Sequence, residues 1–204
     1  MKKLVMTFAL VLFGLGALQA QLKTEAFIKD GKAVQLATTE GYQEKDGRVW
    51  ILSKKDKQAD PVWSKLSLGR GNNIVEAQLQ FHRRSDLYGK GVPSQASIHF
   101  GSRVIVLDGG KEGDILLKEE GKEDVVLGKT ADFIKMKKLF KLKVARINGE
   151  IIIKINNKLV GKHDVKSDKG SAIGKVGLAC NQSVMQVISF TARSQSFEGG
   201  EVAK

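Results

Sequence analysis

Hydrophobic and polar residues alternate along several short segments of the chain, which is the pattern of half-buried β-strands. In the clearest segment, from Val75 to His82, hydrophobic side chains alternate with the polar residues Glu76, Gln78, Gln80 and His82. Successive side chains of a strand point to opposite faces of its sheet. This segment therefore predicts a strand with one face in the core and one polar face.

Other hydrophobic runs, separated by turn residues, predict further strands. They lie at Arg48–Leu52, Val62–Leu68, Ala96–Phe100, Arg103–Leu107, Ile115–Leu117 and Val125–Leu127, and in a ladder from Phe140 to Arg193. In that ladder, Asn148-Gly149 and Asn156-Asn157 have the composition of two-residue hairpin turns, whose residues adopt positive φ. The sequence shows no sustained 3.6-residue hydrophobic period with helix caps, so little helix is expected.

This succession of short strands predicts an all-β sandwich or barrel with minor helix, and large sheets favour a sandwich of two packed antiparallel sheets. Residues 41–195 form the predicted sandwich. Residues 21–40 carry an indistinct pattern and are expected to be an N-terminal extension or an edge strand. Residues 196–204 are predicted to be a disordered tail.

The first 20 residues have the pattern of a secretory signal peptide. Lys2 and Lys3 precede an uncharged run from Leu4 to Leu18, and Ala20 is the expected last residue before cleavage. The run is short for a membrane span, which needs about 20 apolar residues. We therefore predict export to the periplasm or the extracellular space, with an uncleaved N-terminal anchor as the alternative.

The chain is basic, with 34 Lys and Arg residues against 22 Asp and Glu residues and a formal charge of +12. A basic exported protein can bind acidic polysaccharide, lipopolysaccharide or anionic lipid headgroups, whereas export argues against nucleic acid as a partner. Lysines also solvate outer strand faces and block edge pairing. This simpler role suits Lys141 and Lys143, which alternate with Phe140, Leu142 and Val144.

Cys180 is the only cysteine. An internal disulfide is therefore excluded, and stability must come from packing. The position of Cys180 within an apolar run favours a small buried side chain over a reactive thiol.

Two motifs of the ladder resemble a known superfamily. The segment Ile153-Lys-Ile-Asn-Asn-Lys-Leu-Val160 is similar to the motif hydrophobic-x-hydrophobic-Asn-Gly-Lys-x-Val, with Asn157 in place of the glycine. A Gly-x-Ile-Gly-Leu element follows as Gly174-Lys-Val-Gly-Leu178. Together they resemble the concanavalin A-like lectin/glucanase superfamily, above all the bacterial 3-keto-disaccharide hydrolase domain and its laminin-G-like relatives. The resemblance extends from Gly41 to Arg193.

These motifs are structural, so the resemblance implies a concanavalin A-like fold, an all-β jelly-roll sandwich of two antiparallel sheets, and says little about activity. The laminarinase-like branch of the superfamily carries a Glu-x-Asp-x-x-Glu strand, which supplies the nucleophile and acid of retaining hydrolysis. The only dense carboxylate run here, Glu119–Asp124, contains glycine and lacks strand alternation. A two-carboxylate glycosidase is therefore disfavoured, and Glu76 and Asp108 remain as candidates for a catalytic acid or base.

The polar positions between Glu76 and Asp108 are the expected carbohydrate-binding residues. Sugar sites combine an exposed aromatic ring with polar side chains. Tyr88, in the long loop after the alternating strand, is the best exposed aromatic candidate, because Trp50 and Trp63 are expected in the core. The predicted set is Gln78, Gln80, His82, Arg83, Tyr88, Ser97, His99 and Arg103.

No metal or other cofactor is expected. His82 and His99 would supply two ligands if they faced the same way on neighbouring strands, but a third ligand at suitable spacing is missing. Asp108-Gly109-Gly110 would suit a calcium loop of the kind found in some laminin-G-like relatives, although a plain turn is the simpler interpretation.

We therefore predict an exported, non-catalytic module that binds carbohydrate or an acidic polymer of the cell envelope. Two alternatives stay open. One is a saccharide-acting hydrolase similar to the 3-keto-disaccharide hydrolase domain, and the other is a structural or adhesion protein without a small-molecule site.

Overall fold

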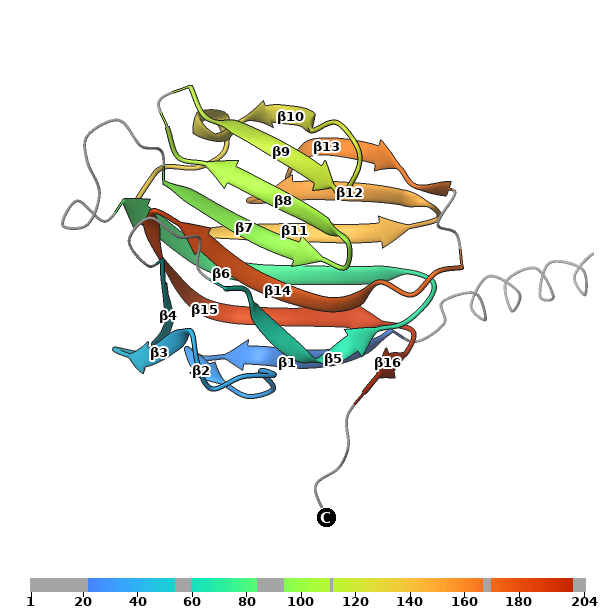
Figure 1. The fold of residues 1–204 in the computed structure, drawn as a ribbon, viewed down its shortest axis with the longest axis horizontal. Helices are drawn as coiled ribbons and strands as arrows, with labels where there is room; N and C mark the ends of the chain where they lie inside the picture. Colours follow the sequence, from blue (N-terminus) through green and yellow to red (C-terminus); the bar gives the residue numbers. More distant parts are fainter. Residues whose placement is uncertain (1–21, 54–59, 84–93, 111, 167–169, 200–204) are drawn as a thin grey trace, which may run out of the picture.

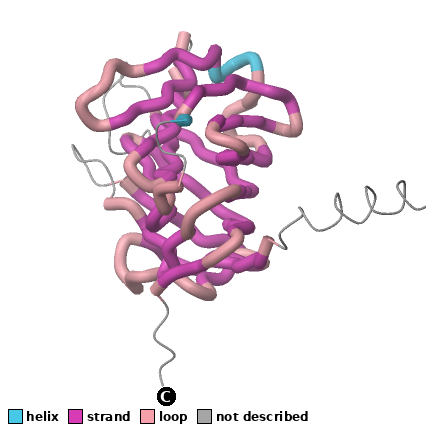
Figure 2. Tube along the Cα trace, turned by 90° about the vertical axis from the view of Figure 1, so that its right-hand side faces the viewer, coloured by secondary structure: helices cyan, strands magenta, loops and turns pink. Residues whose placement is uncertain are grey.

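In the computed structural model, the chain forms a sandwich of two antiparallel β-sheets (Figure 1). The structure describes residues 22–53, 60–83, 94–110, 112–166 and 170–199. Within these ranges, helical backbone is limited to a 3-10 turn, Thr130–Asp132, which Figure 2 shows near the top of the molecule, and to Lys166. The predicted all-β jelly roll with minor helix is confirmed. No helix of the described residues is long and apolar enough to cross a membrane.

Sheet A contains nine strands, with the order β13-β12-β11-β6-β15-β1-β2 and with β4 and β3 attached beside β15. Their bounds are β1 Lys23–Lys29, β2 Lys32–Ala33, β3 Tyr42–Lys45, β4 Arg48–Leu52, β6 Asn73–Arg83, β11 Phe140–Ile147, β12 Glu150–Ile155, β13 Lys158–Asp164 and β15 Ser183–Ser194. The long strand β15 pairs with β6 on one side, while β1 and β4 share its other side.

Sheet B contains seven strands in the order β10-β9-β8-β7-β14-β5-β16. Their bounds are β5 Val62–Leu68, β7 Gln95–Phe100, β8 Arg103–Asp108, β9 Asp114–Glu119, β10 Val125–Lys129, β14 Gly174–Asn181 and β16 Phe197–Glu198. β10 lies against β13, so the two sheets approach each other along this side of the sandwich.

The alternating segment forms β6 as predicted. Val75, Ala77, Leu79 and Phe81 are each at most 3% exposed and belong to the core between the sheets. Sheet B contributes the opposing layer of this core, and Cys180 lies buried within it. Because the odd-numbered positions of β6 are buried, its even-numbered side chains point away from the core.

Two predicted hairpin turns have the expected backbone. Asn148 and Gly149 join β11 to β12 with φ angles of 52° and 83°, and Asn156 and Asn157 join β12 to β13 with φ angles of 50° and 66°. Positive φ at both central residues is the type I′ geometry, which matches the twist of the flanking strands. β11, β12 and β13 therefore form a continuous meander at one side of sheet A.

The first and last strands of the described residues lie in opposite sheets. Residues 23–29, within the predicted extension or edge strand, form β1 and pair with β15 in sheet A. Phe197 and Glu198, which the sequence assigns to a disordered tail, instead form β16 against β5 in sheet B. Phe197 packs against the core, and burial of its ring accounts for this difference. The predicted signal peptide lies outside the described residues.

Candidate functional site

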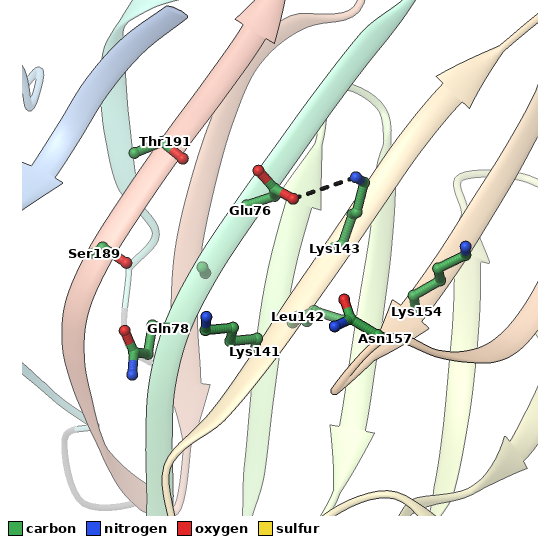
Figure 3. Close-up of a pocket in the computed structure, with 10 residues that line it drawn as sticks. Glu76, Gln78, Lys141, Leu142, Lys143, Lys154, Asn157, Ser189 and Thr191 are labelled. Carbon is green, nitrogen blue, oxygen red and sulfur yellow. Dashed lines mark ion pairs between the residues drawn. The ribbon is translucent and has the colours of Figure 1, made fainter.

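The outer face of sheet A carries a hollow of about 250 Å³. It lies over β12, β11, β6 and β15, four neighbouring strands of the sheet (Figure 3). Apart from three lysines, its polar lining consists of the Glu76 carboxylate, the amides of Gln78 and Asn157 and the hydroxyls of Ser189 and Thr191. We call this hollow the sheet A groove.

The strand register determines which side chains meet in the groove. Gln78 of β6 lies opposite Lys141 of β11 on one side and Ser189 of β15 on the other. The next outward row consists of Lys143, Glu76 and Thr191. Side chains directly opposite each other in a sheet have Cβ atoms about 4.5–5.5 Å apart, so groups from three strands converge here.

Both carboxylate oxygens of Glu76 form ion pairs. Its Oε1 lies 3.3 Å from Lys143 Nζ, the pair marked by the dashed line in Figure 3, and its Oε2 lies 3.0 Å from a terminal guanidinium nitrogen of Arg193. Glu76 is the only carboxylate that lines the groove. A substrate would therefore have to displace one of these cations before Glu76 could serve as an acid or base.

Three lysines line the groove, and they differ in their partners. Lys143 is paired with Glu76, whereas Lys141 and Lys154 form no ion pair with any carboxylate of the described residues. Lys154 of β12 lies directly opposite Lys143 of β11. The groove thus combines one carboxylate with several cations.

The polar face of sheet A continues from the groove toward β4. Gln80 of β6 lies opposite Gln186 of β15, which in turn lies opposite Trp50 of β4. The Arg48 guanidinium donates a hydrogen bond to the Gln186 side-chain oxygen, and the Trp50 indole N–H donates one to the Lys45 carbonyl at 3.0 Å. This row adds a partly exposed aromatic ring to the outer face that contains the groove.

The prediction that both tryptophans lie in the core is wrong. In β4 the inward positions belong to Val49 and Ile51, so Trp50 points outward. Trp63 of β5 is also partly exposed and lies on the outer face of sheet B, where its ring contacts His99 edge-on at a centroid distance of 5.1 Å. The short hydrophobic runs around each tryptophan did not reveal which positions would face inward.

The predicted carbohydrate-binding residues do not form one face. Gln78, Gln80 and His82 point outward from sheet A, whereas Ser97 and His99 belong to β7 of sheet B. The two groups lie on opposite outer faces of the sandwich, so the suggested pairing of His82 with His99 is wrong. Strand alternation gave the correct phase in each strand but not the sheet to which the strand belongs.

Two further candidates have structural roles. Arg103 is 4% exposed and donates two hydrogen bonds, each of 3.1 Å, to the Glu119 carboxylate, so its prediction as a surface binding residue is wrong. Asp108 Oδ1 accepts the Gly110 backbone N–H at 2.8 Å, and its Oδ2 accepts a hydrogen bond from the Gln95 amide. Asp108 therefore caps a plain turn after β8. This strand belongs to sheet B, whereas the groove lies on sheet A.

Tyr88 lies outside the described residues, as does the side chain of Arg83, the last residue of β6.

The two histidines of the predicted set have lowered basicity. Burial lowers the pKa of His99, and burial together with the positive charge of Lys137 lowers the pKa of His82. Across the described ranges, no three His, Cys, Asp or Glu side chains gather as metal ligands would.

Sequence reasoning missed six polar residues of the groove: Lys141 and Lys143, to which it gave only a solvating role, and Lys154, Asn157, Ser189 and Thr191. In β15 the register shifts between Val187 and Ser189. Such a β-bulge reverses which positions face outward, and this reversal brings Ser189 and Thr191 to the groove. The available signal was the alternation of apolar and polar residues from Val187 to Arg193. Knowledge of the bulge was needed to connect its phase with that of the preceding residues.

No family model matches the chain, and no curated protein matches it in sequence. Solved structures match most of its length at low sequence identity. The carbohydrate recognition domain of Emp47p has a TM-score of 0.59 and 10% identity, covering 89% of this chain and 99% of that domain. The PL7 alginate lyase AlyA1 from Zobellia galactanivorans has a TM-score of 0.54 and 12% identity, covering 79% of this chain and 82% of that chain.

These likenesses establish the fold. The chain has a concanavalin A-like β-sandwich fold, as the sequence motifs implied. The proteins that share this fold with it include a carbohydrate recognition domain and PL7 alginate lyases.

Proposed function

We propose that this chain is an exported, non-catalytic carbohydrate-binding protein whose binding site is the sheet A groove. The observation that carries the proposal is the convergence of Gln78, Asn157, Ser189 and Thr191 in one hollow. Sugar hydroxyls donate and accept hydrogen bonds, and so do amide and hydroxyl side chains. A shallow hollow with few convergent polar groups is the usual form of a site for such ligands.

The aromatic ring of Trp50 supports the same assignment. It is partly exposed on the outer face of sheet A, in the row formed with Gln80 and Gln186. Aromatic rings supply the apolar contact that complements polar groups in ligand sites. A saccharide longer than the groove would reach Trp50 by continuing across β15 toward β4.

The non-catalytic part of the proposal rests on Glu76. Its two oxygens face Lys143 and Arg193 at 3.3 Å and 3.0 Å, and the groove lining holds no second carboxylate. Hydrolysis by a carboxylate pair requires two such groups on either side of the scissile bond. Export rests on the sequence of residues 1–20 alone, in which Lys2 and Lys3 precede an apolar run.

A glycan array, followed by titration of the best ligand, tests the proposal. We expect the double variant Gln78→Ala with Ser189→Ala to lose roughly 5- to 150-fold in affinity, since each lost hydrogen bond contributes ~0.5–1.5 kcal/mol. The control is Ser102→Ala, an exposed turn residue between β7 and β8 of sheet B, which should bind as the wild type does. Thermal unfolding of both variants verifies that they are folded.

Three results would count against the proposal. Glycan binding that is unaffected by the groove variants would place the site elsewhere. Absence of binding to every glycan would favour the structural or adhesion role. Turnover of a bound saccharide, lost on Glu76→Gln, would favour a hydrolase.

A further inference from the structure

We infer that the ligand of the sheet A groove is an anionic glycan, one that carries carboxylate or sulfate groups. This inference rests on the proposed carbohydrate-binding function and specifies its ligand. It comes from the distribution of charge along the groove, which neutral sugars would not require.

The groove carries more positive charge than its one carboxylate can neutralise. Glu76 is the only carboxylate among the described residues that line the groove, and it already forms ion pairs with Lys143 and Arg193. Lys141 and Lys154 are exposed, and no carboxylate of the described residues pairs with either of them. Two ammonium groups are therefore available to a ligand at the groove.

The β11–β12 register makes this excess costly for the fold. Lys143 lies directly opposite Lys154, and like charges in this position destabilise a sheet. Lys154 is exposed, so packing does not require a lysine there, and a carboxylate at this position would have paired with Lys143. A ligand that brings its own negative charge would remove the repulsion.

The groups between the cations favour a glycan over other anions. Figure 3 shows Lys141 extending toward Gln78, while Lys154 lies beyond Asn157 on the other side. The Gln78 amide therefore lies beside the Lys141 ammonium group, and the Asn157 amide lies between the two lysines. Acid groups at separate positions of a glycan can each bind one ammonium group while neighbouring hydroxyls bond the amides. A layer of lipid headgroups is itself flat, whereas these lysines line a hollow.

The test uses a panel of uronate-containing and sulfated oligosaccharides, each paired with its carboxyl-reduced or desulfated form. Binding to the full chain is measured by calorimetry at several salt concentrations. We expect at least one anionic member to bind more tightly than its neutral counterpart, with an affinity that falls as salt rises.

The double variant Lys141→Gln with Lys154→Gln should lower that affinity roughly 4- to 25-fold, if each lysine contributes the two- to fivefold of an exposed ion pair. The matched control is Lys65→Gln with Lys175→Gln. It removes the same charge from two exposed lysines of sheet B and should change affinity less than about twofold.

Each other outcome has a distinct meaning. Equal affinity for charged and neutral forms, with or without the lysines, overturns the anionic inference and leaves the carbohydrate site intact. Failure of every panel member and of neutral glycans overturns the proposed function itself. Lysine-dependent binding to phosphatidylglycerol vesicles without any glycan binding assigns the groove to lipid and refutes the inference.

Discussion

Replacement of Glu76 by glutamine should lower stability and, at the same time, raise affinity for anionic glycans. Glu76 forms ion pairs with Lys143 and Arg193, and the three side chains are 33–43% exposed. Exposed pairs of this kind each contribute ~0.2–1 kcal/mol, so the change should cost ~0.4–2 kcal/mol of unfolding free energy. For a domain of this size that corresponds to a fall in Tm of roughly 1–8 °C.

Thermal unfolding followed by circular dichroism at low and high salt measures this effect. The loss in Tm should shrink at high salt, because salt screens exposed charges. Glu150→Gln is the control, since its carboxylate forms only one ion pair, to Lys162 at 3.8 Å, and it should lose less. Binding of an anionic glycan should tighten about two- to fivefold in Glu76→Gln. An unchanged Tm at low salt, or a loss that salt does not reduce, would refute the electrostatic role assigned to Glu76.

Three further predictions concern the framework. Glu119→Ala removes the carboxylate that accepts two hydrogen bonds from the almost fully buried Arg103. It should lower the unfolding free energy, measured by urea denaturation, by about 3 kcal/mol. A loss below about 1 kcal/mol would contradict this role. Gly31→Ala should cost at least about 1–2 kcal/mol in the same assay, because Gly31 has a φ of +72° and a Cβ there would lie 1.8 Å from the carbonyl oxygen of the β3–β4 turn. Burial lowers the pKa of His99, so the unfolded chain binds protons more readily, and stability should fall as pH drops below 6.5. His99→Gln should reduce this dependence and leave the part that comes from the lowered pKa of His82, whereas His163→Gln should leave it unchanged.

The phase of individual strands could be predicted from the sequence because it depends only on neighbouring residues. Alternation in β6 placed Glu76, Gln78, Gln80 and His82 on a polar face, and the structure has them there. The hairpin turn at Asn148-Gly149 was equally local, since positive φ is a property of those residue types.

The grouping of strands into sheets could not be predicted, because it depends on pairing between distant segments. β6 and β7 follow each other in the chain, yet they lie in different sheets, which separates His82 from His99. Arg103 was misassigned for a different reason: it has the inward phase of Ile105 and Leu107 in β8, and the Glu119 carboxylate of β9 compensates its buried charge. In β15 a bulge inverted the phase and concealed Ser189 from a strict period-2 pattern.

The position of β15 between the first and the central strands constrains the order of folding. Thr24 of β1 pairs with Arg193, and Val49 of β4 pairs with Val187, so the earliest strands find their partners only near the other end of the chain. Loop-closure entropy makes such long-range pairing slow. Sheet A can therefore be completed only after β15 has been synthesised, and until then β1 and β4 lack the strand with which they pair.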